Sequence, residues 1–279
     1  MKLGYTEFSF GYAFTENLIR SSAAGPKTAP VFPNLSQEAY LGYDVNIDLP
    51  GRPLFFQYKL PEIMTRDTAR EIATYGLPRL TTPFFRMPLM PSGLSKQHEL
   101  LMKLEKKYPK AVFYASPKMQ NGRAFNGAYA KAEVHRKSVL FSPNDIGPLP
   151  DPKAHSIAYR DGLAQAWLCS EPKEVAATSF EGLEHGILAD FEQTRFHSLR
   201  AAGPEVRELM RSIVSAPMRE AEASIAEQVR ARRLTDAPTA AQPLEQPIED
   251  ILVAREMARI DLGVELMLAQ PREAAADLS

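Results

Sequence analysis

The sequence predicts a mixed α/β fold, with an α/β domain over residues 1–172 and a helical region over residues 173–279. Three observations predict this fold. Residues 43–60 alternate apolar and polar side chains, which is typical of strands with one buried face. Further along, short apolar runs typical of strands flank a segment with helical spacing. Beyond residue 173 helical spacing dominates, so we expect a sheet with covering helices and a helical appendage.

The segment 43–60 is the centre of the predicted α/β domain. It contains two short strand patterns, residues 43–49 and 53–60, separated by Pro50 and Gly51. Pro presets φ for a turn and Gly tolerates positive φ, so this dipeptide predicts a hairpin.

Polar side chains share faces of this hairpin. Because side chains alternate across a strand, Asp44, Asn46 and Asp48 lie on one face of the first strand. Gln57 and Lys59 likewise point in one direction on the second strand. If the strands pair, an acid, an amide oxygen and an ammonium come together, which is a set typical of a metal site assisted by a lysine.

The rest of the chain is assigned by the period of its apolar residues. Helices are expected over residues 6–20, 61–75, 96–107 and 125–134. Strands that belong to the same sheet are expected over residues 84–89, 111–115, 138–141, 155–160 and 164–169. The C-terminal region is expected to hold helices over residues 179–200, 204–234 with a break near Pro217, and 248–269 after a linker over residues 235–247.

Composition narrows the classes of protein. Residues 1–150 carry 19 Lys and Arg against 12 Asp and Glu, whereas residues 151–279 carry 14 against 22. A basic half suits a phosphate-binding surface, although such a split also occurs in proteins without nucleic-acid partners. The single cysteine, Cys169, excludes an internal disulfide and a thiolate zinc site. With no bilayer-length apolar run and no secretory signal, we expect a cytoplasmic protein.

The order of elements and the D…Q-x-K pattern resemble the core of the PD-(D/E)XK nuclease superfamily. The resemblance covers about residues 5–115. It implies a restriction-endonuclease-like αβββαβ core with a mixed central sheet. It also implies Mg²⁺-dependent hydrolysis of phosphodiester bonds, in which Mn²⁺ can replace Mg²⁺. DNA is the expected substrate, and RNA is the alternative. A role in phage defence or restriction is expected from the family alone.

The resemblance assigns roles to individual residues. Asp44 would be the bridging metal ligand. Gln57 stands where the family has Glu or Asp, and its side chain or the backbone carbonyl of Tyr58 would complete the coordination. Lys59 would orient or deprotonate the attacking water, and Glu16, on the helix before the hairpin, would bind the metal directly or through water.

Two departures from the family pattern leave an alternative open. Gly42-Tyr43-Asp44 replaces Pro-Asp, and Gln57 replaces the acid, which removes one negative charge from the site. The alternative is a catalytically degenerate nuclease fold that acts as an adaptor for nucleic acid or protein. A third reading is a helical scaffold on which the β core is only structural.

Other polar residues are candidates for contacts with nucleic acid. Arg86 can hold a phosphate with two hydrogen bonds, and Lys96, Gln97 and Lys103 lie on a lysine-rich helix that can follow a phosphate backbone. A solvated helix face explains the lysines equally well. Cutting both strands needs two sites, so we expect a homodimer or a complex with a partner protein, with the helix over residues 248–269 as the seam.

Overall fold

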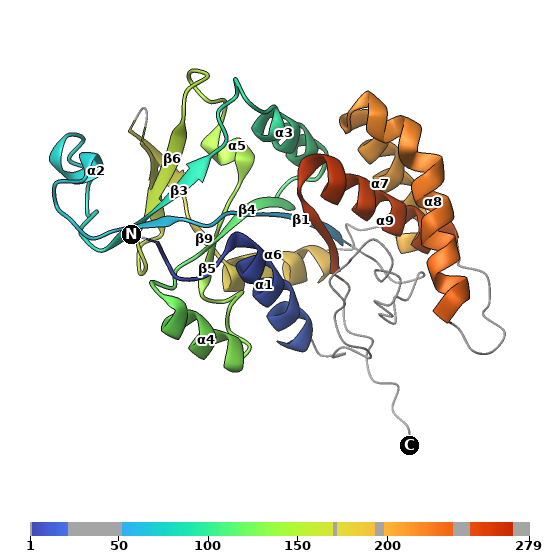
Figure 1. The fold of residues 1–279 in the computed structure, drawn as a ribbon, viewed down its shortest axis with the longest axis horizontal. Helices are drawn as coiled ribbons and strands as arrows, with labels where there is room; N and C mark the ends of the chain where they lie inside the picture. The colour runs from blue at the N-terminus through green and yellow to red at the C-terminus, as the bar shows by residue number, and fades with distance from the viewer. Residues whose placement is uncertain (1, 22–51, 170–171, 193–197, 237–245, 270–279) are drawn as a thin grey trace. The chain divides into compact units, whose positions relative to one another are not determined.

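The computed structural model describes residues 2–21, 52–169, 172–192, 198–236 and 246–269 (Figure 1). The fold is mixed α/β, as the sequence predicts. The chain divides into two compact units, the first formed by Met1–Ser21 with Phe56–Glu184 and the second by Ser22–Phe55 with His185–Ser279. The sequence prediction places a single boundary at residue 172. The division by contacts instead builds each unit from two separate segments.

The described elements follow one another along the chain. The first part contains α1 (Glu7–Ser21), β1 (Arg52–Tyr58), β2 (Glu62–Met64), α2 (Arg70–Ala73), β3 (Phe84–Leu89), α3 (Gln97–Lys107), β4 (Val112–Pro117) and α4 (Gly122–Ala130). The middle part contains β5 (Ser138–Phe141), α5 (Pro143–Ile146), β6 (His155–Tyr159), β7 (Gln165–Leu168), β8 (Lys173–Ala176), β9 (Thr178–Ser179) and α6 (Phe180–Glu192). The last part contains α7 (Leu199–Ile213), α8 (Ala216–Asp236), α9 (Gln246–Met257), the π-helical turn η2 (Ala258–Leu262) and β10 (Glu265–Ala269).

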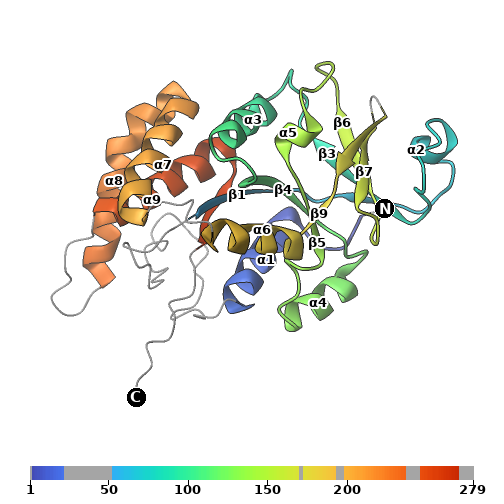
Figure 2. The ribbon, with the colours of Figure 1, turned by 180° about the vertical axis from the view of Figure 1, so that it is seen from behind.

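The strands form two five-stranded sheets. One has the order β10-β1-β4-β5-β9 and the other the order β2-β3-β6-β7-β8. Figure 2 shows β6 and β7 beside β3, and Arg86 on β3 is in register with Ala158 on β6. The expectation of a single sheet is therefore wrong, because β3, β6 and β7 pair with one another and not with β1.

Three segments adopt a different structure from the predicted helix. Residues 61–75 begin with β2, residues 173–179 form β8 and β9, and the last residues of the predicted helix 248–269 form β10. Each of these short segments has a strand partner in one of the two sheets. Pairing with a distant strand overrides local helical spacing, because the ladder satisfies the backbone hydrogen bonds.

An aromatic core joins α1 to β1 in the first unit. The ring of Phe14 lies 5.3 Å from that of Phe56 and 5.5 Å from that of Tyr58. Gly11 allows the close approach, because an added Cβ atom would lie 2.6 Å from Cδ2 of Tyr58. Since Phe56 and Tyr58 face α1, side-chain alternation directs Gln57 to the opposite face of β1.

The helices of the second unit are joined by ion pairs and a shared core. Arg207 on α7 donates to Glu222 on α8 at 2.7 Å and to Asp250 on α9 at 2.8 Å. Arg52, at the start of β1, forms a buried ion pair with Asp190. The buried residues of α9 include apolar Ile251, Val253, Ala254 and Met257 together with Glu249, Asp250 and Glu256. The dimer seam expected over residues 248–269 stays a prediction: these apolar residues of α9 are buried, whereas Ile260 beyond them is 49% exposed.

The part of the chain that the structure describes contains no helix long and apolar enough to cross a membrane.

Candidate active site

Three polar side chains meet between β1 and α3 in the first unit. The side-chain amide of Gln97 donates to Oε1 of Gln57 at 2.8 Å, and Nζ of Lys59 donates to Oε1 of Gln97 at 3.4 Å. We call Gln57, Lys59 and Gln97 the Gln–Lys cluster. Sequence reasoning predicts that Gln57 and Lys59 share a face, and the structure confirms it because both contact Gln97.

Burial sets the electrostatics of this cluster. Lys59 is only 8% exposed. Loss of hydration lowers the pKa of its ammonium, and the negative charge of Glu7 offsets part of that effect. The carboxylate of Glu7 also accepts a hydrogen bond from the backbone N–H of Leu60 at 3.1 Å. A lysine with a lowered pKa can exchange a proton more readily near neutral pH.

Backbone hydrogen bonds fix Lys59 at the end of β1. Its N–H donates to the carbonyl of Ala115 at 2.9 Å, and the hydroxyl of Ser116 donates to its carbonyl at 3.0 Å. The Ser116 hydroxyl lies 2.8 Å from that of Tyr159, which is fully buried and donates to the carbonyl of Pro117 at 2.7 Å. Ser116 and Tyr159 are absent from the sequence prediction, because only the fold brings them to Lys59.

The other side of the cluster is held by the first turn of α3. The hydroxyl of Ser95 accepts from the N–H of Gln97 at 3.1 Å and so satisfies a backbone donor at the start of α3, whose N-cap is Lys96. The next residue, His98, is buried with its ring nitrogens 2.9 Å from the hydroxyl of Tyr114 and 2.8 Å from the carbonyl of Gly147. These contacts fix the rotation of α3 and so direct Gln97 towards β1.

Glu16 lies elsewhere. Its carboxylate accepts from the side chain of Asn17 at 2.7 Å and from Nε of Arg20 at 2.8 Å. It is carried by α1, which packs against the face of β1 opposite to Gln57. The structure therefore does not bring Glu16 to the Gln–Lys cluster, and the carboxylate that influences Lys59 is Glu7. The hydroxyl of Thr6 accepts from the N–H of Ser9 at the start of α1. Glu7, the next residue, therefore lies in the first turn of the helix, and this position is the sequence signal that could have identified Glu7.

The predicted nucleic-acid contacts separate into two groups. Nε and Nη2 of Arg86 each donate to Glu71 on α2 at 2.6 Å, so both sides of its guanidinium already bind a carboxylate. That Arg86 binds a phosphate stays a prediction, in which a phosphate would replace Glu71 as the partner of its guanidinium. Lys96 and Lys103 are exposed at the start and in the middle of α3, where they remain accessible to an anionic partner.

Metal ligands are only partly described. Asp44, together with the first predicted strand of the hairpin, lies outside the described residues. The carbonyl of Tyr58 accepts from the amide of Gln57 at 3.3 Å, so two amide oxygens and one carbonyl oxygen lie in this region. Within the described residues no group of three or more His, Cys, Asp or Glu is placed to hold a metal. Oxygen donors suit Mg²⁺, and the oxygen donors described in this region are neutral.

No family model, curated protein or solved structure matches the chain. The chemistry of the Gln–Lys cluster is therefore the basis on which a function can be assigned. The cluster offers hard oxygen donors, one ammonium with a lowered pKa, and an adjacent helix with exposed lysines. This combination is suited to a phosphate ester.

Proposed function

We propose that the protein is a Mg²⁺-dependent nuclease that hydrolyses phosphodiester bonds, with DNA as its main substrate. Mn²⁺ can replace Mg²⁺ in this proposal. The observation that carries the proposal is the burial of Lys59 beside the amide oxygens of Gln57 and Gln97. Burying an ammonium costs free energy unless its charge has a partner or a function. Here the ammonium donates to the neutral amide of Gln97 and its nearby charge is the exposed Glu7, so a chemical role accounts for Lys59 better than a structural one.

Each residue of the cluster has a part in this proposal. Asp44, the side-chain oxygen of Gln57 and the carbonyl of Tyr58 would hold the metal. The bound metal would neutralise charge on the phosphate and lower the pKa of a bound water. Nζ of Lys59 would orient the attacking water or take its proton, and Gln97 keeps Nζ in place through the hydrogen bond at 3.4 Å.

The lysines of α3 supply attraction for the polyanion. Exposed cations on this helix are Lys103, Lys106 and Lys107, with Lys96 at its start. Contacts between lysine and phosphate depend on charge rather than sequence, so binding should weaken as salt increases. A nuclease of this kind fits a restriction or phage-defence role in the cytoplasm, either as a homodimer or with a partner protein.

A cleavage assay tests the proposal. The purified chain is incubated with supercoiled plasmid, linear duplex and single-stranded oligonucleotides in Mg²⁺, Mn²⁺ or EDTA. Lys59→Met removes the ammonium but keeps most of the buried alkyl chain, and Lys131→Ala removes an exposed lysine on α4 as the control. We expect metal-dependent cutting that is lost in Lys59→Met and kept in Lys131→Ala. Cutting that persists in Lys59→Met would refute the assigned role of Lys59.

A second candidate function is favoured by the neutral side chain at Gln57. With an amide in place of the family's acid, the fold can serve as an adaptor that binds nucleic acid or protein without hydrolysis. Calorimetry with Mg²⁺ or Mn²⁺ separates the two functions. Heat of binding that disappears in Asp44→Ala supports the nuclease, whereas the absence of any metal response supports the adaptor.

A further inference from the structure

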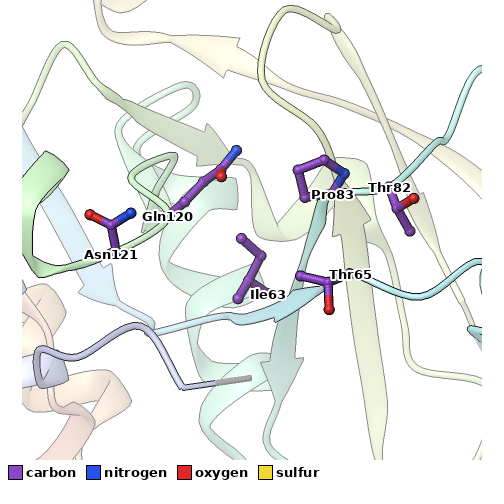
Figure 3. A pocket seen from close by; sticks show the side chains of 6 residues that line it. All are labelled: Ile63, Thr65, Thr82, Pro83, Gln120 and Asn121. Carbon is purple, nitrogen blue, oxygen red and sulfur yellow. The ribbon is translucent and has the colours of Figure 1, made fainter.

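A cavity of about 240 Å³ lies in the first unit, and no residue of the Gln–Lys cluster is among those that line it (Figure 3). It is lined by Ile63, Thr65, Thr82, Pro83, Gln120 and Asn121. Figure 3 shows Gln120 and Asn121 on one side of the hollow, Thr65, Thr82 and Pro83 on the other, and Ile63 between them. The lining combines an apolar floor with two amides and two hydroxyls and contains no charged side chain.

The cavity is connected to Lys59 by two short stretches of chain. The N–H of Lys59 donates to the carbonyl of Ala115, so these residues are neighbours in the first sheet. Ile63 follows Lys59 by four residues and Gln120 follows Ala115 by five. Four extended residues span at most about 13 Å, so the cavity lies within the length of a few nucleotides from the Gln–Lys cluster.

The amides of the lining are suited to the edge of a planar polar ring. Oδ1 of Asn121 caps α4 by accepting from the N–H of Ala124 at 3.0 Å, and Thr82 donates to Asp67 at 2.5 Å. Gln120 is exposed and has no hydrogen-bond partner among the described residues. Its amide offers a donor and an acceptor side by side, the pattern by which proteins read the edges of unpaired nucleobases. Pro83 is exposed and offers apolar surface for the face of such a ring, whereas Ile63 is buried beneath the hollow.

Positive charge flanks this lining. Arg66 directly follows Thr65, and Arg123 follows Asn121 by two residues in the first turn of α4. Both arginines are exposed and form no ion pair with another described residue. The nearby acid Asp67 is engaged by Thr82. The surroundings therefore favour a ligand that combines a polar ring with phosphate.

We propose that this cavity binds one unpaired nucleobase of a DNA or RNA strand, within a few nucleotides of the phosphate that lies at the Gln–Lys cluster. The inference rests on the proposed nuclease function and specifies its substrate as single-stranded or locally unpaired. The size of the cavity supports a single base, because it is smaller than the ~300–1,000 Å³ pockets that enclose drug-sized ligands.

The test measures binding in EDTA, so that hydrolysis plays no part. Fluorescence anisotropy is recorded with a short single-stranded DNA, the same strand as RNA, the same DNA backbone without bases, and the duplex. Gln120→Ala is the test variant, and Asn126→Ala, which removes an exposed amide from the middle of α4, is the matched control. Gln120 is exposed, so its replacement should leave the fold intact, and thermal unfolding of each variant checks this.

We expect the affinity for a single strand to depend on its bases, and we expect Gln120 to account for that dependence. Gln120→Ala should weaken binding of the intact single strands about 3- to 10-fold, as the loss of one or two hydrogen bonds predicts, and should not change binding of the strand without bases. The DNA and RNA arms show which sugar is accepted. Equal binding of intact and base-free strands by the unaltered protein, or equal effects of Gln120→Ala and Asn126→Ala, would overturn the inference.

The two proposals fail in different ways. If plasmid is cut through Lys59 but binding ignores the bases, the nuclease function stands and the base pocket falls. If binding depends on Gln120 but no metal supports cutting, the pocket stands and the protein is the adaptor.

Discussion

The amide of Gln97 on α3 donates a 2.8 Å hydrogen bond to Gln57 on β1, and its own oxygen faces the ammonium of Lys59. Gln97 therefore orients both of the other residues of the Gln–Lys cluster. Its amide hydrogens hold the oxygen of Gln57, and its oxygen solvates Nζ of Lys59. A helix and the end of a strand thus share one chain of hydrogen bonds through Gln97.

Restoring the family's acid at position 57 should strengthen metal binding. We expect Gln57→Glu to bind Mg²⁺ or Mn²⁺ about tenfold more tightly, because a carboxylate adds negative charge where the described donors are neutral. Isothermal calorimetry measures the affinity. Gln120→Glu places the same charge outside the cluster and should leave the affinity unchanged. Equal affinities for Gln57→Glu and the unaltered protein would show that position 57 does not contact the metal.

Removing the charge of Glu7 should lower the pKa of Lys59 further. Burial lowers this pKa and Glu7 raises it, so Glu7→Gln leaves the effect of burial less opposed. NMR titration of the lysine side chain should move to lower pH, and so should the acidic limb of the pH–rate profile if neutral Lys59 takes the proton. Glu99→Gln removes a carboxylate from the exposed side of α3 and serves as the control. An unchanged titration in Glu7→Gln would separate Glu7 from the site.

Adding a methyl group at Gly11 should destabilise the first unit. The added Cβ would lie 2.6 Å from the ring of Tyr58, whose hydroxyl is fixed 2.7 Å from that of Thr15, so we expect a loss of about 1–3 kcal/mol. Gly127 on α4 has no atom within 4 Å of an added Cβ, so Gly127→Ala should instead stabilise by roughly 0.5–1 kcal/mol. Urea unfolding followed by the fluorescence of Trp167 measures both changes. Equal effects at both glycines would show that contact with Tyr58 is unimportant.

Acid should weaken the first unit through His135. Burial, with a smaller contribution from Arg136, lowers the pKa of this histidine from 6.5 to about 4, and Glu181 opposes the shift. Its Nδ1 has no hydrogen-bond partner in the described structure, and its ring lies 4.8 Å from that of Phe180. The unfolded chain therefore takes up a proton before the folded one. The contribution is fully present above pH 6.5 and is lost as the pH falls towards 4, up to about 3 kcal/mol.

The same unfolding assay at a series of pH values checks this expectation. His135→Phe keeps an aromatic ring in the core but cannot titrate, so its stability should fall less between pH 6.5 and 4 than that of the unaltered protein. His185→Gln, which replaces an exposed histidine on α6, should follow the unaltered protein. Parallel pH profiles for His135→Phe and the unaltered chain would exclude His135 as the source.

Local sequence patterns predicted those helices and strands whose buried face can be identified from their own residues. The strand of Gln57 and Lys59, helix α3 and strand β4 follow from period and capping alone, because each shows its buried face in its own sequence. The second sheet could not be predicted from local sequence patterns. Its strands are short, and β3 acquires its partners Glu62 and Ala158 only when distant segments pair.

The residues of the candidate site were likewise only partly predictable from the sequence. Gln57 and Lys59 were found because they share one strand, where alternation predicts their direction. The choice between Glu7 and Glu16 was not determined by spacing, because both lie on α1 and only packing shows which end of the helix approaches β1. The helix over residues 248–269 was predicted as a dimer seam from its apolar residues, and spacing alone did not show that those of α9 are buried while Ile260 is exposed.

Arg52 and its partner Asp190 are 138 residues apart, and the segment Phe56–Glu184 lies between them. A ribosome adds about 5–20 residues per second, so Arg52 is synthesised roughly 7 to 30 s before Asp190. During translation, the whole sequence of the first unit is therefore synthesised before the ion pair between Arg52 and Asp190 can form in the second unit. A nascent chain that stalled at Glu184 would already contain Gln57, Lys59 and Gln97, whereas Asp190 would not yet have been synthesised.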